Sequence, residues 1–477
     1  MGKVVTHTGE RGQASAARLS AQAGWILLGV SVVVLTVMAI SVPHLVGGAG
    51  WLTGEKFLYL ALIAYLGAAA LYVFSAALRQ PQLLAGAMAL TRGGFLLHTM
   101  AILVRWASSG HAPLSNIYEM VLVFSWGVVA LHEFAEWKFE LPFLGAITIP
   151  IAALSLILMQ VLPGEIRPLV PALQSTWLQI HVTLAMLSYA GFTLSFAVAL
   201  LFLLKDGVSA RSLLSWTSGL VLGVYGVIAL TLLDRGMGLS LTAWDPATQD
   251  KIMLGPKQPL LVSIPSLGWP FLIVLVLAAA SLATNLFAAP PEENRASAGW
   301  PRRLFLATIF AQALALALLG VKVVSGPYFV AQYGQSFDVH LASSPFLLAG
   351  IATAIFASLA WEVLNWKYDS IVNYLPQRDT LDGLVYKSVA ISFPLLTLMI
   401  IAGAYWANRT WGTYWSWDPK EDWALITWIT YLGYLHMRLT RGWRGRRSAY
   451  FALIGFAIVM FTFFGVTYLL PGLHAYA

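Results

Sequence analysis

Long apolar runs recur from one end of this chain to the other, and they restrict its fold more than any other feature. Of 477 residues, 59% are hydrophobic and 10% are charged, against about a quarter charged in soluble domains. Many runs reach the ~20 residues that a helix needs to cross a bilayer. Backbone groups inside lipid must bond within their own segment, and an outer-membrane barrel would show short alternating segments. We therefore expect an all-α fold, a polytopic transmembrane helical bundle.

Hydropathy predicts thirteen membrane spans, with boundaries set to within a few residues. They cover Gly24–Val42, Phe57–Leu78, Gly93–Trp106, Asn116–His132, Phe143–Leu162, Trp177–Leu204, Leu213–Leu233, Trp269–Ala289, Leu304–Val324, Pro345–Leu364, Ser388–Trp406, Trp423–His436 and Ala449–Leu470. An odd number of spans places the two termini on opposite sides of the lipid bilayer.

The distribution of Lys and Arg sets the orientation. With a cytoplasmic N-terminus, 19 of the 28 basic residues fall on the cytoplasmic side, as the positive-inside rule requires. The C-terminus and the segment Ala407–Asp422 are then extracytoplasmic. The net charge of +7 is explained by topology, so we expect no nucleic-acid partner. Met1–Ser20 is polar, and the first apolar stretch is long enough to remain as an anchor rather than a cleaved signal.

Two further features limit the chemistry and the domain organisation. Cysteine is absent, which excludes disulfides, thiolate metal sites, a cysteine nucleophile and thioether attachment of haem to this chain. No Ser/Gly linker separates the spans, so we expect one membrane domain. The external loop Asp234–Gly268 contains several prolines and is expected to form a small cap over the bundle.

The nine histidines separate by depth. His98 lies about 9 Å from the cytoplasmic end of its helix at 1.5 Å per residue, and His436 lies at a similar depth. His181 is near the outer end of its span, and His474 follows the last span. Two facing imidazoles are a common way to hold haem iron, but a lone membrane histidine is as often a hydrogen-bonding group between helices. Other histidines share these depths: His132 inside, and His44, His111 and His340 outside.

The strongest local signal is Trp-Gly-Thr-Tyr-Trp-Ser-Trp-Asp-Pro-Lys-Glu-Asp-Trp at residues 411–423. Interfacial belts usually place one or two aromatics at a helix end, whereas this Trp-rich segment has five in thirteen residues. Its tryptophans can pack against a flat porphyrin, and neighbouring cations can bind the porphyrin's carboxylates. The sequence Asp-Pro-Lys-Glu also predicts a helix start with an N-cap aspartate. The candidate haem-contacting residues are Trp411, Trp415, Trp417, Asp418, Trp423, Arg409 and Lys420.

The same residues carry a family resemblance. The segment resembles the tryptophan-rich signature of haem-handling proteins in cytochrome c maturation, and the chain is similar to the CcsA (ResC) type of the System II cytochrome c synthase. The similarity covers 93–205, including Arg105-Trp106 and Gly110–Glu119, and 381–477, including Gly472–Tyr476. The organisation is thus 1–92, N-terminal spans; 93–205, first CcsA-like block; 206–380, inserted spans; and 381–477, second CcsA-like block.

The resemblance implies a function in cytochrome c biogenesis. Haem b would cross the bacterial plasma membrane and be held outside for thioether attachment to apocytochrome c, with this chain as a component of a holocytochrome c synthase. His181 and His474 would be the external axial ligands, and His436 would belong to an inner haem site. The second inner ligand would come from a CcsB/ResB-type partner or from His98, which depth alone suggests.

Two other functions remain open. A bis-histidine haem b redox subunit would take the ligands of adjacent haems from the same helices, whereas the four best histidines here lie on four different spans or ends. A solute transporter often shows repeated halves with interrupted helices, and the sequence shows none.

Overall fold

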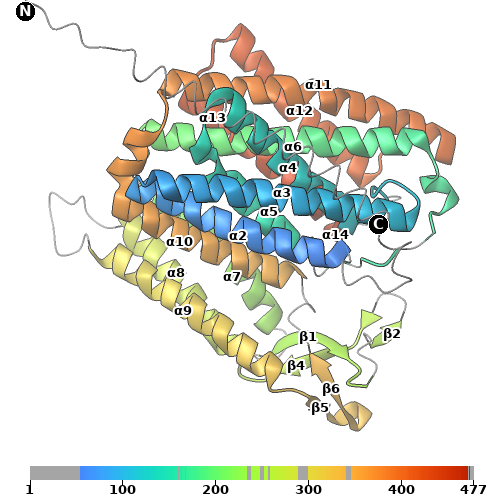
Figure 1. Cartoon of the computed structure of the whole chain (residues 1–477). Helices are drawn as coiled ribbons and strands as arrows, with labels where there is room; N and C mark the ends of the chain where they lie inside the picture. Colours follow the sequence, from blue (N-terminus) through green and yellow to red (C-terminus); the bar gives the residue numbers. More distant parts are fainter. Residues whose placement is uncertain are drawn as a thin grey trace, which may run out of the picture.

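The computed structural model describes residues 54–159, 162, 164–166, 168–233, 238–247, 252–255, 258–287, 299–339, 345–470 and 472. Helices dominate these residues (Figure 1). The long ones are α2 (Gly54–Leu78), α3 (Pro81–Ser109), α4 (Ile117–Phe139), α5 (Gly145–Met159), α6 (Thr176–Lys205), α7 (Ala210–Leu233), α8 (Gly268–Phe287), α9 (Trp300–Val324), α10 (Pro345–Tyr374), α11 (Arg378–Trp411), α12 (Pro419–Thr440) and α13 (Arg446–Met460).

Each expected span from the second to the thirteenth falls largely on one of these helices, and Gly24–Val42 lies outside the described residues. The expected span at 93–106 was too short, because α3 begins with Pro81 at its first turn and ends at Gly110, whose φ of 72° closes the helix. Proline at the start and a left-handed glycine at the end are common helix boundaries. Within the described residues, ten helices are long and apolar enough to cross a membrane; α10 and α12 are not among them. The chain is a multi-pass membrane protein, and the count of thirteen and the orientation stay predictions.

The helices pack around two hydrophobic cores. The larger core unites α2–α6 with α11–α13, and the smaller unites α7–α10 with a β-sheet. In Figure 1, α7, α8, α9 and the sheet lie on one side of the larger bundle. Helix α10 serves both cores, with Trp361 buried in the smaller and Ile371 in the larger. Between them α10 is kinked at Lys367, whose φ of −130° is not helical. The division of the chain at residues 206 and 380 stays a prediction.

The sheet is the element that the all-α prediction missed. Strands β1 (Leu239–Trp244), β4 (Leu261–Ile264), β5 (Tyr328–Val330) and β6 (Gln335–Val339) form a four-stranded antiparallel sheet in the order β4-β1-β6-β5, and β2 (Met253–Gly255) pairs with β3 (Gln258–Pro259). Pairing of β1 with β6 joins two loops that are distant in the sequence. The cap expected from Asp234–Gly268 is therefore a sheet completed by a second loop.

Short elements complete the described part of the chain. Two 3-10 turns, η1 (Pro142–Leu144) and η2 (Pro171–Leu173), precede α5 and α6, and a third, η4 (Ala331–Tyr333), lies between β5 and β6. After α13 the helix widens into a π-helical turn, η6 (Phe461–Gly465), and continues as α14 (Val466–Leu469). Helices α6 and α11 share the most extensive helix–helix contact of the described residues, and the candidate site lies where these two helices meet the Trp-rich segment.

Candidate functional site

A cleft lies between α6, α11, the α3–α4 loop and the Trp-rich segment. The empty space within its bounds is about 1050 Å³, including space that opens to the surface. Its walls are mainly apolar and aromatic. The residues that matter for its chemistry are His181, Trp406, Tyr414, Trp415, Lys420 and Glu421. The cleft therefore unites one of the predicted histidines with part of the Trp-rich segment.

His181 is held in the tautomer that a metal ligand requires. It lies in the second turn of α6, and its Nδ1 donates a hydrogen bond to the Met399 carbonyl of α11 at 2.7 Å. With the proton on Nδ1, the lone pair is on Nε2. Histidine ligands usually donate their second nitrogen to a carbonyl or carboxylate in this way. The ring also stacks on Trp406, with centroids 6.5 Å apart and planes 19° apart.

A glycine makes room for the His181 ring. A Cβ atom at Gly403 would lie 2.5 Å from Nδ1 and 2.6 Å from Cε1 of His181, closer than any ordinary contact. Gly403 is one turn before Trp406 on α11, so this helix supplies the gap, the stacking partner and the Met399 carbonyl. The sequence prediction missed Trp406 because it was placed at the end of a membrane span, although its spacing from Gly403 suits one helix face.

The tryptophans of the Trp-rich segment have different surroundings. Trp415 lines the cleft. Trp411 instead packs edge-on against Trp406, with centroids 4.8 Å apart, and Trp423 packs on Phe461 at 4.2 Å. Trp417 is 71% exposed and adopts a φ of 58°, a left-handed conformation that is unfavourable for residues with a side chain. Of the four predicted tryptophans, one lines the cleft.

Asp418 caps α12, as the sequence predicted. Its carboxylate accepts from the Lys420 amide at 3.0 Å, and Pro419 occupies the first turn. The Glu421 carboxylate completes a capping box by accepting from the amides of Asp418 at 3.3 Å and Ser416 at 2.7 Å. Because these bonds satisfy helix-start donors and also hold Ser416, they fix how the Trp-rich segment enters α12.

The two predicted cations are placed differently. Lys420 lines the cleft and precedes the span expected from Trp423. Burial lowers its pKa, and the nearby Asp418 opposes that shift. An anionic group of a ligand in the cleft would favour the charged lysine. Arg409 is exposed, and its guanidinium donates to the Tyr405 hydroxyl at 2.9 Å and lies over the Tyr405 ring; it does not line the cleft.

His474 lies outside the described residues, but the chain just before it is placed. A side chain at Gly472 would collide with the carboxylate of Asp418 and would lie 3.1 Å from the ring of Pro419. Gly472 therefore lies directly against the start of α12. This position is two residues from His474 and adjoins the Trp-rich segment.

The inner histidines are not brought together. His98 is fully buried between α2, α3 and α4, and both ring nitrogens have partners: the Tyr65 hydroxyl at 3.4 Å and the Leu122 carbonyl at 3.1 Å. His436 is exposed on α12. The structure therefore gives His98 the surroundings of a hydrogen-bonding core residue. His132 likewise bonds Tyr72 and Thr148.

Comparison with known proteins identifies the family. Residues 114–474 match the sequence model of a family described as cytochrome C assembly protein. The chain belongs to this cytochrome c assembly family. It is similar to the cytochrome c biogenesis protein CcsA of Nostoc punctiforme, with 31% identity over 435 residues, 89% of this chain and 97% of that protein. CcsA of Synechocystis sp. is 30% identical over 441 residues, which are 91% and 98% of the two chains.

These matches confirm the predicted resemblance and extend it. The cytochrome c assembly family model spans 114–474, and the CcsA alignments cover about nine tenths of this chain. The description of 206–380 as inserted spans stays a prediction.

Proposed function

We propose that this protein acts in cytochrome c biogenesis and holds haem b, its cargo, in the cleft between α6, α11 and the Trp-rich segment. The observation that carries the proposal is His181, which is held by the Met399 carbonyl in the ligand tautomer at a cleft walled by tryptophans. Family membership supports the same function. His474 is the second proposed axial ligand, because Gly472 already lies against the Asp418 cap.

Each part of the cleft has a role in this proposal. Trp415 would pack on the haem plane, Trp406 would support the ring of His181, and Lys420 would pair with a propionate. A Cys-X-X-Cys-His segment of apocytochrome c would enter from the open side, where its thiols add to the haem vinyl groups. The protein contributes positioning rather than acid–base chemistry, as a component of a holocytochrome c synthase. The cleft would face outward from a bacterial plasma membrane.

The inner haem site is proposed to need a CcsB/ResB-type partner. His436 is exposed on α12 in line with exposed Ile429, Leu432 and Leu439, so this imidazole and an apolar helix face are both available to another membrane helix. His98 is enclosed with both nitrogens bonded. We therefore assign the second inner ligand to the partner in place of His98.

The test is the visible spectrum of detergent-purified protein from haem-replete cells. Wild type is compared with His181→Ala, His474→Ala and the double variant, and with His436→Ala to separate an inner haem. A bis-histidine haem b spectrum that weakens in the His181 and His474 variants, and returns with added imidazole, supports the outer site. Two haems that are indifferent to these changes would favour a redox subunit. Absence of haem from wild type, while a control haem protein is loaded, would reject haem handling.

A further inference from the structure

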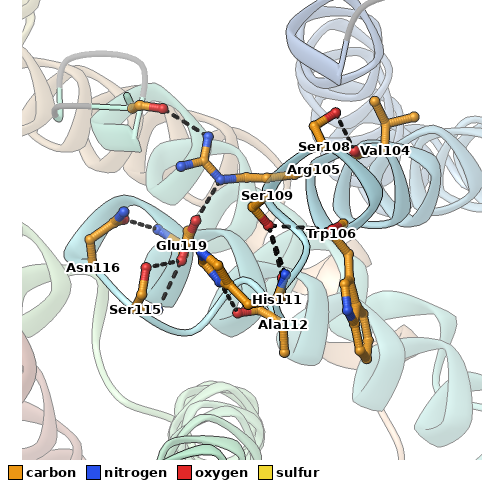
Figure 2. Close-up of polar contacts among 11 residues, drawn as sticks. Val104, Arg105, Trp106, Ser108, Ser109, His111, Ala112, Ser115, Asn116 and Glu119 are labelled. Carbon is orange, nitrogen blue, oxygen red and sulfur yellow. Dashed lines mark hydrogen bonds and ion pairs between the residues drawn. The ribbon is translucent and has the colours of Figure 1, made fainter. Parts of the chain in front are cut away.

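Ion pairs join α3 to α4 at two levels, and only the pair near the end of α3 adjoins the cleft. The outer pair is Arg105 with Glu119, whose side chains are 11% and 1% exposed. Arg105 and Glu119 belong to the family-like stretches of the sequence, yet no step of the proposed function uses them. Figure 2 shows the hydrogen bonds that radiate from this pair into the α3–α4 loop.

Glu119 fixes the end of that loop. Its Oε1 accepts from Arg105 Nε at 2.8 Å, while its Oε2 accepts from the amide and the hydroxyl of Ser115 at 2.8 and 2.6 Å. The N-cap residue Asn116 in turn accepts from the Glu119 amide at 3.0 Å. The Glu119 carboxylate thus connects Arg105 of α3 to Ser115, the residue before the α4 N-cap. Its charge-assisted hydrogen bonds are stronger than neutral ones.

Arg105 extends the same network to a third segment. Its Nη1 donates to the carbonyl of Gly164 at 2.8 Å, in the connection between α5 and α6. Its guanidinium lies 4.5 Å from the centre of the Tyr118 ring, and the same ring covers Gly164, where a Cβ atom would approach it to 3.0 Å. The ion pair therefore holds α3, the start of α4 and the α5–α6 connection at fixed positions.

The loop between these points has little freedom. Gly110 has a φ of 72°, the Ser109 hydroxyl donates to the His111 carbonyl at 2.9 Å, and His111 Nδ1 contacts the Ala112 carbonyl at 3.0 Å. Arg105 Nη2 and His111 Nε2 are buried and, within the described residues, lack a hydrogen-bond partner.

The loop that this pair holds is a wall of the cleft. Leu114, Ser115 and Met120 line the same cleft as His181 and Trp415. Ser115 is therefore both a lining residue and a direct hydrogen-bond partner of Glu119. A change in the ion pair would reach the cleft through a single residue.

We propose that Arg105 and Glu119 are positioning residues for the outer cleft, and that they set how firmly its cargo is held. The inference rests on the proposed function, since its readout is bound haem. Binding sites need supporting residues that hold the contacting groups to within about 0.5 Å. Replacing such supporting partners typically weakens metal binding 10- to 100-fold.

The same two helices provide the control. About three and a half turns before Arg105, Arg92 of α3 pairs with Glu133 and Glu136 of α4, each at 3.4 Å, and its own side chain is 25% exposed. The two glutamates are 4% exposed, and none of these three residues lines the cleft. A loss of stability common to any broken α3–α4 ion pair would appear at both levels, whereas a positioning effect would appear only at the outer pair.

The experiment compares Glu119→Gln and Arg105→Lys with Glu136→Gln and Arg92→Lys in full-length protein. Three quantities are measured: haem per protein, the rate of haem transfer to a scavenging haem protein, and the thermal midpoint. We expect the outer variants, Glu119→Gln and Arg105→Lys, to release haem 10- to 100-fold faster, with a smaller bis-histidine fraction in the spectrum. The inner variants, Glu136→Gln and Arg92→Lys, should lower the thermal midpoint to an extent similar to that of the outer variants and keep the wild-type rate of haem release.

One further variant covers the case in which a single outer substitution prevents folding. Removing one partner leaves an uncompensated buried charge, whereas removing both does not. The double variant Arg105→Gln with Glu119→Gln should therefore accumulate, yet still release haem rapidly. Equal release rates from outer and inner variants, or wild-type release from the double variant, would overturn the positioning role. A wild-type protein without haem would reject the proposed function and this inference with it.

Discussion

The substitution Gly403→Ala tests the outer ligand without removing it. The new methyl group would lie 2.5 Å from His181 Nδ1, whereas non-bonded atoms prefer about 3.5 Å. The ring must therefore move by about 1 Å, and the bond from Nδ1 to the Met399 carbonyl would be lost or bent. Neither the imidazole nor its basicity is changed directly, so any effect on haem comes from position.

Gly403→Ala should weaken haem binding more than it destabilises the folded protein. Overpacking costs about 1–3 kcal/mol, but alanine in place of helical glycine returns about 0.5–1 kcal/mol, so the protein should still accumulate. Loss of the hydrogen bond that orients a ligand histidine should weaken haem binding by about 10- to 100-fold. The assay is haem content and the bis-histidine absorption spectrum at equal protein concentration in detergent.

Gly383 on the same helix provides the matched control, because a Cβ atom there meets nothing within 4 Å. Gly383→Ala should keep the wild-type spectrum and raise the thermal midpoint slightly. If Gly403→Ala also kept the wild-type haem content and spectrum, the reasoning that places His181 on the iron would be refuted.

Three further predictions follow from individual residues. Asp418→Ala should cost about 1 kcal/mol of stability through loss of the α12 cap, whereas Asp418→Asn should cost less; thermal midpoints in detergent measure both. Trp417→Gly should stabilise the folded protein by about 1 kcal/mol, because glycine tolerates the φ of 58°; a simultaneous fall in cytochrome c maturation in cells would show that the strained, exposed ring serves the reaction. His98→Ala should destabilise the protein by about 2 kcal/mol and leave the haem spectrum intact; loss of one haem with unchanged stability would restore His98 as an inner ligand.

Helix positions could be predicted well from the sequence because bilayer thickness imposes a length on every apolar run. The second to the thirteenth expected spans fall largely on α2–α13, and Asp418 could be identified as a cap because its chemistry involves only neighbouring residues. The sheet could not be predicted in this way. Its strands β1 and β6 belong to separate loops and acquire hydrogen-bond partners only when α7–α9 place those loops together.

The same distinction between local pattern and tertiary packing applies to the candidate site. The sequence by itself determined the membrane fold, the Trp-rich segment and the choice of His181, since each depends on local pattern or family resemblance. Only the tertiary structure decided that Trp406 and Lys420 line the cleft, that Trp423 and Arg409 do not, and that His98 is enclosed. The physical reason is that hydropathy sets how deep a residue lies along the membrane normal. The direction in which its side chain points depends on the helices that pack beside it.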